Sequence, residues 1–432
     1  MAIARAIPTK RTPIASLTIA GIVSLTGSML TSVAIPWFVL QTTNSAAKTG
    51  LTGVFATLPY IIGGVFGGAL VDRLGFKRMS VLADLTSGAT IALIPLLYHT
   101  VGLAFWQLLA LTFLANLFNT PGNTARQSLV PALASLAGMR LERANALVES
   151  MPRFAILFGP PLAGILIALF GASNVLWLDA ASFVFSALMI GGFIPRRPPA
   201  DARGAAPHRY FADLAEGWRF LSAHRLLRAF TWLFLFTNLI ESPWSLLLAV
   251  YTKRAFGTAV SFGTVLAALG AGAIVSSFLF AAVGHRLPRL GVLALYPIGG
   301  ALTFSALALS LPFVALVAVT FVYGLAVGMV NPLTTTIRQE QVPAALLGRV
   351  QGINTAMSFA LIPLGRGIGA VLVDPIGLPI LFLSIGVLFA LATVVMLALP
   401  IFHNLNAPDT ESVASSFLFR LTCGRGHREN ED

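Results

Sequence analysis

Charged residues are scarce in this sequence: only 10% of its 432 residues are Asp, Glu, Lys or Arg, against about 25% in an average soluble domain. Soluble proteins need charged groups to cover their surface, so this scarcity excludes an ordinary water-soluble enzyme and a disordered chain. Cysteine and histidine are also rare, with one and six residues. Cys423 therefore has no intrachain disulfide partner, and no Cys/His cluster indicates a zinc site.

Long apolar runs are abundant instead: 56% of the residues are hydrophobic and the mean hydropathy is +0.84. A helix of about 20 apolar residues crosses the ~30 Å hydrocarbon layer of a bilayer. The runs are continuous rather than alternating, which favours helices over a strand barrel. The sequence therefore predicts an all-α polytopic membrane protein. We place twelve predicted spans at Ile14–Leu40, Thr49–Val71, Met79–Tyr98, Ala104–Asn119, Leu147–Phe170, Asn174–Ile194, Ala229–Tyr251, Ala259–Val283, Gly291–Leu311, Pro312–Asn331, Val350–Val373 and Pro379–Phe402.

Basic residues are distributed unevenly among the loops between these spans. With the N-terminus inside, 23 of the 28 Lys and Arg residues fall in cytoplasmic segments, and only Lys48, Lys253 and Arg254 fall in outer loops. Cytoplasmic loops of membrane proteins are enriched in Lys and Arg. We therefore expect both termini in the cytoplasm and the protein in the inner (plasma) membrane. The net charge of +12 then reflects membrane anchoring and not nucleic-acid binding.

A polar connector separates the spans into two groups of six. Its segment Phe211–Leu221 has apolar residues at helical spacing, which favours an amphipathic helix at the inner membrane surface, with a plain tether as the alternative. We predict an N-terminal bundle at 1–194, the connector at 195–228, a C-terminal bundle at 229–402 and a cytoplasmic tail at 403–432.

The two groups of spans also resemble each other in sequence. Several residues recur in the same order and at equivalent points of each group, which indicates two six-helix bundles related by a parallel pseudo-repeat. Such repeats enclose a central site in carriers that expose it alternately to each side. The recurring pairs are Arg73 with Arg286, Arg126 with Arg338, Arg143 with Arg349, and Gly159 with Gly365.

The loop after the second predicted span carries the motif Gly68, Asp72, Arg73, Gly75, Lys77 and Arg78. It resembles the loop motif of the major facilitator superfamily, and this resemblance implies the major facilitator fold and a cytoplasmic latch between the halves. Gly75 permits a tight turn, and Asp72 can pair with a base or lie at a helix N-terminus. Phe76 replaces a usual base, and His285 stands at the second-half position of Asp72. We therefore expect an asymmetric latch; a positively charged turn without a gating role is the alternative.

The fifth predicted span carries Gly159, Pro160 and Gly164, with Arg153 before them. This segment resembles the Gly-Pro motif of drug-exporting antiporters in the superfamily, although Ala163 replaces a usual glycine. Proline kinks a helix and small residues allow close packing, so a structural kink is the alternative. Similarity along residues 14–402 points to the branch with macrolide exporters and the enterobactin exporter. The fourth predicted span lacks the arginine that many proton-coupled drug antiporters carry.

Charged residues inside the predicted spans are costly, at ~3 kcal/mol or more near the bilayer centre. Glu241 is the best candidate for a carboxylate that cycles a proton, because burial favours its neutral form; a Glu satisfied by a neighbouring helix is the alternative. Asp179, at the start of the sixth predicted span, is a second candidate, with helix capping as its alternative. Arg366 could neutralise Glu241, bind an anionic substrate or pair with Asp374.

Other polar and aromatic residues in the spans have structural interpretations. We expect Asp84 and Glu149 to form ion pairs, and Tyr323 to line a cavity or anchor its span at the interface. The candidate partners of the two acids are Arg78, Arg140, Arg143 and Arg153.

These patterns predict a secondary active transporter that exports amphipathic drug-like or macrolide-like molecules, driven by proton antiport. A siderophore exporter and a lysolipid or metabolite carrier are the alternatives within transport, and a non-transporting sensor lies outside it. The sequence has no phosphate-binding loop and no hydrolase nucleophile motif, so we expect neither an enzyme nor a bound cofactor. We expect a monomer whose partners are the bilayer and a small amphipathic substrate.

Overall fold

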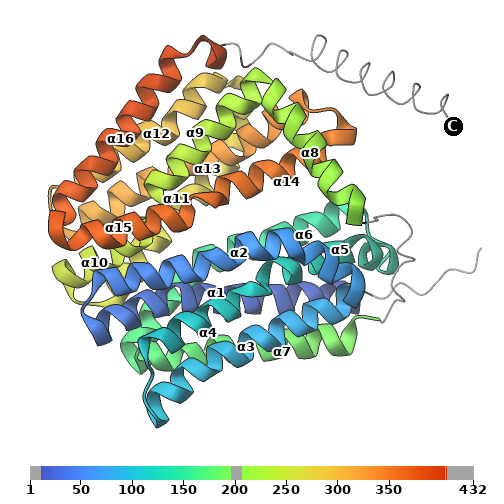
Figure 1. The fold of residues 1–432 in the computed structure, drawn as a ribbon, viewed down its shortest axis with the longest axis horizontal. Coiled ribbons are helices and arrows are strands. Elements are labelled where there is room, and N and C mark those ends of the chain that lie inside the picture. The colour runs from blue at the N-terminus through green and yellow to red at the C-terminus, as the bar shows by residue number, and fades with distance from the viewer. Residues whose placement is uncertain (1–10, 196–206, 404, 406–432) are drawn as a thin grey trace, which may run out of the picture. The chain divides into compact units, whose positions relative to one another are not determined.

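The computed structural model describes residues 11–195, 207–403 and 405, without the side chains of 64–69, 72, 142, 207–214, 285, 344, 345, 348 and 355. Helices occupy nearly all of this described part of the chain (Figure 1), which confirms the all-α class. The helices are α1 (Thr12–Thr43), α2 (Ala46–Leu74), α3 (Phe76–Thr100), α4 (Phe105–Leu117), α5 (Asn119–Leu136), α6 (Leu141–Phe170), α7 (Ala172–Phe193), α8 (Pro207–Ala223), α9 (Arg225–Glu241), α10 (Trp244–Phe256), α11 (Ala259–Val283), η1 (Gly284–Arg286), α12 (Arg289–Leu307), α13 (Phe313–Gln341), α14 (Ala344–Ala360), α15 (Ile362–Ile376), α16 (Leu378–Ala398) and η2 (Pro400–Phe402).

Ten helical stretches of the described residues are long and apolar enough to cross a membrane. Each coincides with one of the twelve predicted spans, so the chain is a multi-pass membrane protein. The other two predicted spans, Thr49–Val71 and Ala104–Asn119, fall on α2 and α4. With 13 residues, α4 is about 20 Å long, which is shorter than the hydrocarbon layer. The count of twelve spans stays a prediction.

The stretch Arg225–Phe256 is divided into α9 and α10 near its middle. Pro243 lies at the division and lacks a backbone donor, so the helical hydrogen-bond ladder is interrupted there. Ser242 caps the end of α9 by donating its hydroxyl to the carbonyl of Leu239 at 2.9 Å. The break leaves Glu241 as the last residue of α9, an acid at a helix end inside a membrane span.

Contacts between helices group the chain into two compact units. The first comprises Met1–Arg203, Pro243–Ala267 and Arg366–Pro375, and the second comprises Gly204–Ser242, Ala268–Gly365 and Ile376–Asp432. This grouping follows contacts rather than chain order. The predicted domains at 1–194, 195–228, 229–402 and 403–432 therefore stay predictions.

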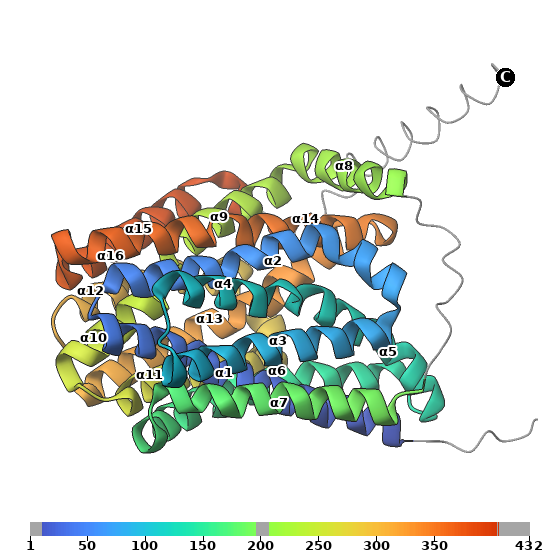
Figure 2. The ribbon, with the colours of Figure 1, turned by 60° about the horizontal axis from the view of Figure 1, so that its bottom comes forward.

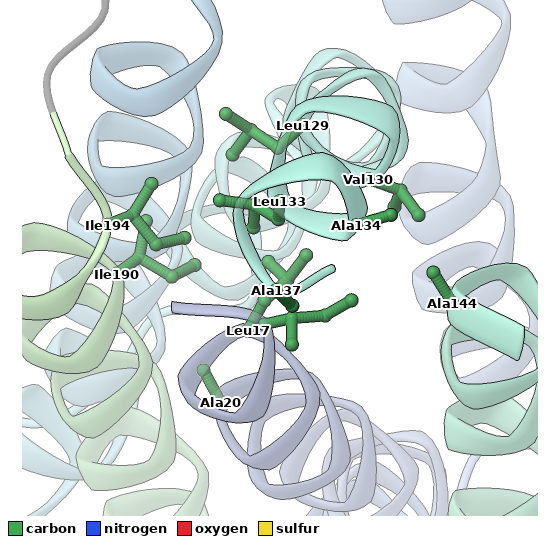
Figure 3. Close-up of a cluster of buried hydrophobic side chains, with 11 residues drawn as sticks. Leu17, Ala20, Leu129, Val130, Leu133, Ala134, Ala137, Ala144, Ile190 and Ile194 are labelled. Carbon is green, nitrogen blue, oxygen red and sulfur yellow. The ribbon is translucent and has the colours of Figure 1, made fainter. Parts of the chain in front are cut away.

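In the first unit, α1 packs against α6 and α7, and α3 packs against α7, so that α1, α3 and α7 run side by side (Figures 1 and 2). A buried apolar cluster ties the beginning of α1 to α5, α6 and the end of α7 (Figure 3). Each buried Leu or Ile contributes roughly 1.5–3 kcal/mol. The cluster consists of Ile14, Leu17, Ala20, Leu129, Val130, Leu133, Ala134, Ala137, Ala144, Ile190 and Ile194.

In the second unit, α12 packs against α13 and α16, and α8 packs against α14. Glycines allow α11 and α13 to touch, because a Cβ on Gly328 would lie only 2.1 Å from the carbonyl oxygen of Ala273. The predicted connector helix is present as α8, and its Phe220 and Leu221 are buried in a cluster with Leu346 and other residues of α14. This part of α8 is thus attached to the protein itself.

The internal repeat is visible in the backbone conformation. Gly171 precedes α7 with φ 82° and ψ 153°, and Gly377 precedes α16 with φ 83° and ψ 154°. These two glycines are 206 positions apart, as are Gly159 and Gly365. Positive φ is costly for residues with a side chain, so both halves use glycine for the same turn before their last long helix.

Candidate functional site

A cavity of about 320 Å³ in the second unit contains Glu241. Its size lies at the lower end of the range for small-molecule sites, roughly 300–1,000 Å³. Its wall comes from α9, α12, α13, α14 and the first residue of α15, and it mixes apolar and polar side chains. The apolar members are Phe234, Val327, Val330, Phe359 and Ile362, and the polar ones are Asn238, Glu241, Tyr296, Asn331, Thr334, Arg338, Gln351, Asn354 and Ser358.

Two tyrosines hold the carboxylate of Glu241. The Tyr296 hydroxyl of α12 donates to Oε2 at 2.5 Å, and the Tyr323 hydroxyl of α13 donates to Oε1 at 2.9 Å. Both tyrosines are buried. The Tyr296 ring also stacks on those of Phe234 and Tyr323, with centroids 6.4 Å apart in each case. The carboxylate is therefore fixed in position by three helices.

This arrangement can exchange a proton for another cation. Phenol donors stabilise the carboxylate without neutralising it, and the described side chains of the second unit include no base in an ion pair with Glu241. A negative charge in a membrane span needs a counter-charge or a proton. Glu241 can therefore bind either a proton or a cationic group that enters the cavity.

Asp179 lies inside α7 and not at its N-terminus, which Gly171 caps, so the capping interpretation is wrong. Its side chain is 1% exposed and faces α1, where the Thr31 hydroxyl donates to Oδ2. Ser182 donates to Oδ1 at 3.2 Å. Because Gly27 has no side chain, α1 can lie directly against these groups. Asp179 is thus a buried acid whose oxygens are bonded to hydroxyls of α1 and α7.

Arg366, in α15, donates from Nη1 to the Gly53 carbonyl of α2 at 3.1 Å, both within the first unit. The predicted alternative of an ion pair between Arg366 and Asp374 is wrong. Asp374 pairs with Arg254 instead, with Oδ1 3.5 Å from Nη2. Two helical turns separate Arg366 from Asp374 along α15, about 12 Å. A substrate role for Arg366 stays a prediction.

Asp84 forms an ion pair, as expected, but with a different partner. Arg126 of α5 donates to Oδ1, and the Ser186 hydroxyl of α7 donates to Oδ2 at 2.7 Å. None of the four arginines expected as candidate partners forms this ion pair. The predicted spans leave residues 120–146 between them as a cytoplasmic segment, whereas α5 forms a helix there that carries Arg126 to Asp84 of α3. Glu149 is exposed.

The predicted gating loop forms the sharp junction between α2 and α3. Gly75 adopts φ 78° there, which confirms the tight turn. Arg73 and Arg78 are exposed, and Lys77 donates to the carbonyl of Ile194 at the end of α7. The surroundings of Gly68 and the side chains of Asp72 and His285 lie outside what the structure describes, so a latch role for this loop stays a prediction.

The Gly-Pro segment of α6 is a close-packing surface within the first unit. A Cβ on Gly159 would lie 2.3 Å from Cβ of Met29 in α1, and one on Gly164 would lie 2.9 Å from the Ala259 carbonyl of α11. Pro160 is buried, whereas Arg153 is exposed. The glycines therefore have a packing reason, and an antiporter-specific role stays a prediction.

Sequence reasoning missed Tyr296 and the position of Arg338 on the cavity wall. A tyrosine within an apolar span resembles an ordinary interface anchor. The sequence presents Arg338 as a cytoplasmic charge and as the repeat equivalent of Arg126, and neither pattern predicts a cavity there. The signal for Tyr296 was its place on a span of the same half as Glu241, beside Pro297.

A protein family and several known proteins match this chain along most of its length. The family model for the Major Facilitator Superfamily matches residues 17–365 and 243–420. The multidrug efflux pump Tap of Mycolicibacterium fortuitum is 30% identical over 407 residues, covering 92% of this chain and 98% of Tap. Macrolide efflux protein A of Streptococcus pyogenes is 23% identical over 381 residues, covering 86% of this chain and 92% of that protein.

Solved structures show the same fold. A crystal structure of a mutant of the nucleoside transporter NupG superposes with a TM-score of 0.74, covering 91% of this chain and all of that one at 14% identity. A POT family transporter in complex with 5-aminolevulinic acid superposes with a TM-score of 0.70 at 10% identity and 91% coverage of this chain. At these identities the likeness concerns the fold alone.

Proposed function

This chain belongs to the Major Facilitator Superfamily, and from that premise we propose that it is a secondary active exporter of amphipathic drug-like molecules, macrolides among them. The observation that carries the proposal is the match to the multidrug efflux pump Tap along 92% of this chain. The match to macrolide efflux protein A adds support for the substrate class. The mixed apolar and polar wall of the cavity suits an amphipathic molecule.

Proton antiport is the energy source of this proposal. Glu241 binds a proton in one conformation and releases it when a substrate group takes its place in the other. Two tyrosine donors keep the carboxylate aimed at the same point in both protonation states. Competition for a single buried acid couples proton entry to export, because the two cations cannot occupy it together.

The remaining parts of the proposal concern setting and partners. The protein acts as a monomer in the inner (plasma) membrane. Both of its termini lie in the cytoplasm, a proposal that the distribution of Lys and Arg supports. It carries out transport rather than catalysis, and its energy comes from the proton gradient rather than from a bound cofactor. These statements rest on the sequence pattern and on the family.

Accumulation in efflux-deficient cells tests the proposal. Cells expressing the protein receive erythromycin, a fluorescent cationic dye or a catecholate siderophore, each with and without a protonophore. We expect lower accumulation of the macrolide or the dye, reversed by the protonophore. Export of the siderophore alone, or no change for any compound in cells with verified membrane protein, contradicts drug export.

Substitution of the acid tests the coupling. Glu241→Gln should abolish protonophore-sensitive export, while Glu149→Gln, at an exposed acid of α6, should retain it. Equal export by both variants would show that Glu241 does not couple transport to protons.

A further inference from the structure

An arginine in each half of the repeat occupies the same sequence position but has different surroundings. In the first unit, Arg126 is neutralised: it pairs with Asp84 of α3, which also accepts from Ser186 of α7. A buried charge needs such a partner, because breaking a buried pair typically costs 3–5 kcal/mol. Arg126 is therefore a structural residue that joins α3, α5 and α7.

Its repeat partner Arg338 lacks both of those groups. The position of Asp84 corresponds to Tyr296 or Pro297 of α12, depending on whether the offset of the arginine pair or that of the helix starts is used. The whole of α12 contains no Asp or Glu. Ser186 corresponds to Ala392 of α16, at the offset of 206 that relates Gly171 to Gly377. The second half thus keeps the cation without its internal counter-charge.

The other acids of the second unit do not replace the missing one. Its described side chains include three carboxylates. Glu340 accepts hydrogen bonds from both Nη atoms of Arg289, at 2.5 and 2.9 Å, and Glu216 forms an ion pair with Arg349. Glu241 is held by its two tyrosines. Among the residues that the structure describes, none forms an ion pair with Arg338.

Arg338 lines the same cavity as Glu241. Its side chain is partly buried, and its Nε has no hydrogen-bond partner among the described residues. Thr334, Gln351 and Asn354 of the cavity wall supply further polar groups. A guanidinium that lines a cavity of molecular size and has no ion-pair partner among the described side chains is suited to a carboxylate, which it can bind through two parallel hydrogen bonds.

We propose that Arg338 binds an anionic group of the transported molecule, so that the cavity selects amphoteric substrates whose cationic group meets Glu241 and whose carboxylate meets Arg338. The inference rests on the proposed function, since it names the substrate class of the same cavity. The bound carboxylate takes the place that Asp84 fills in the first half. Substrates with only a cationic group still bind, but more weakly.

A matched pair of dyes tests this selectivity. Rhodamine 110 carries a free carboxylate, and rhodamine 123 is its methyl ester, so the two differ in the anionic group alone. Binding is measured by fluorescence anisotropy with the full chain in phosphatidylcholine nanodiscs. We expect the wild type to bind rhodamine 110 more tightly. Arg338→Gln should weaken that binding about 10- to 100-fold, the usual value of a charge-assisted hydrogen-bonded pair, and leave rhodamine 123 nearly unchanged.

Two further variants separate charge from fold. Arg338→Lys keeps the charge but loses the planar fork, so its affinity for rhodamine 110 should fall between those of the wild type and Arg338→Gln. Arg219→Gln removes an exposed arginine of α8 and should bind both dyes like the wild type. An Arg338→Gln protein that weakens both dyes equally, or neither, overturns the proposal.

The remaining outcomes distinguish this inference from the proposed function. Binding of both dyes without export in cells contradicts the exporter and leaves the anion site standing. Equal affinity of the wild type for the two dyes, or affinity for neither, overturns the anion site and leaves export untouched. If phosphatidylglycerol in the nanodiscs abolishes the preference for rhodamine 110, the anion at Arg338 is a lipid phosphate, which overturns the substrate assignment.

Discussion

At the scale of single residues, Glu241 owes its position to groups on two other helices. Its oxygens accept from Tyr296 and Tyr323, and hydrogen bonds to a charged group contribute about 1.5–3 kcal/mol each. The break at Pro243 brings the acid to the end of α9, where its side chain meets α12 and α13. The two donors from α12 and α13 therefore determine where the carboxylate lies.

The tyrosines can be tested without altering the acid. Tyr296→Phe and Tyr323→Phe remove one donor each while keeping the ring, so each should lower the initial rate of energised export about tenfold or more. Export from inverted membrane vesicles, normalised to protein abundance, measures the effect. Tyr98→Phe, at a partly exposed ring of α3, is the control and should retain the wild-type rate. Wild-type rates in both test variants would contradict the role of the two donors.

The ion pair of the first unit makes a separate prediction about stability. Asp84→Ala leaves Arg126 without its counter-charge and should reduce the free energy of unfolding by about 3–5 kcal/mol. Removing both charges in Asp84→Ala/Arg126→Ala should cost less than Asp84→Ala alone. Unfolding of the detergent-purified variants measures both changes, and a double variant at least as unstable as the single one would refute the assignment.

The candidate site was only partly predictable because charge alone does not identify a partner. Glu241 stood out, since an acid inside an apolar span is costly. Tyr296 did not, because aromatic residues are ordinary there. Arg338 fitted the charge bias of cytoplasmic loops so well that nothing in the sequence indicated its place on a cavity. The pair of Asp84 and Arg126 depends on a polar helix, α5, which the apolar runs do not predict.

At the scale of elements, the connector helix α8 docks on α14 through an ion pair and through close packing. Glu216 pairs with Arg349 of α14, and the next residue, Gly217, lies directly against that helix. A Cβ on Gly217 would be 2.8 Å from Cδ1 of Ile353 and 3.1 Å from Cβ of Arg349. The bare backbone of α8 at this point is what allows the two helices to approach.

Two glycine substitutions should therefore have opposite effects. Gly217→Ala should lower the free energy of unfolding by about 1–3 kcal/mol, as overpacking does. Gly352→Ala, in α14 with nothing within 4 Å of its added Cβ, should raise it by up to about 1 kcal/mol through helix propensity. Thermal unfolding of the purified variants compares them. Destabilisation by both, or by neither, would show that α8 does not dock on α14 as described.

The sequence predicts helix positions well where the apolar runs are long. It predicts them poorly where a polar helix such as α5 follows an apolar run. Ten predicted spans coincide with helices of spanning length, because the bilayer permits few other structures for such runs. The divisions at Pro243 and at Leu361 were not predicted. The first follows from a missing backbone donor, but a proline such as Pro36 lies inside an unbroken helix, so proline alone does not specify a break.

At the scale of the whole molecule, the balance of basic residues predicts which side of the membrane each loop faces. It predicts that Lys253 and Arg254, in the last turn of α10, face the outside and that the tail with Cys423 lies in the cytoplasm. The scarcity of cysteine makes this orientation simple to test.

Labelling with a membrane-impermeant maleimide measures the orientation. The native protein, with Cys423 as its only cysteine, should be labelled in lysed cells but not in intact ones. A Cys423→Ser/Ala255→Cys variant, with its thiol in the last turn of α10 at an exposed position, should be labelled in intact cells. Labelling of native Cys423 from outside would reverse the proposed topology.

The internal repeat, which is visible in the equivalent turns at Gly171 and Gly377, has a consequence for how the protein can evolve. Two copies of one architecture allow one copy to keep a position for cohesion while the other varies it. The first half retains an acid, a base and a hydroxyl that bind each other, so mutation there is penalised in folding. The second half has other residues at two of these three positions. Selection for a new resistance spectrum should therefore accumulate substitutions on α12, α13 and α14, and few on α3, α5 and α7.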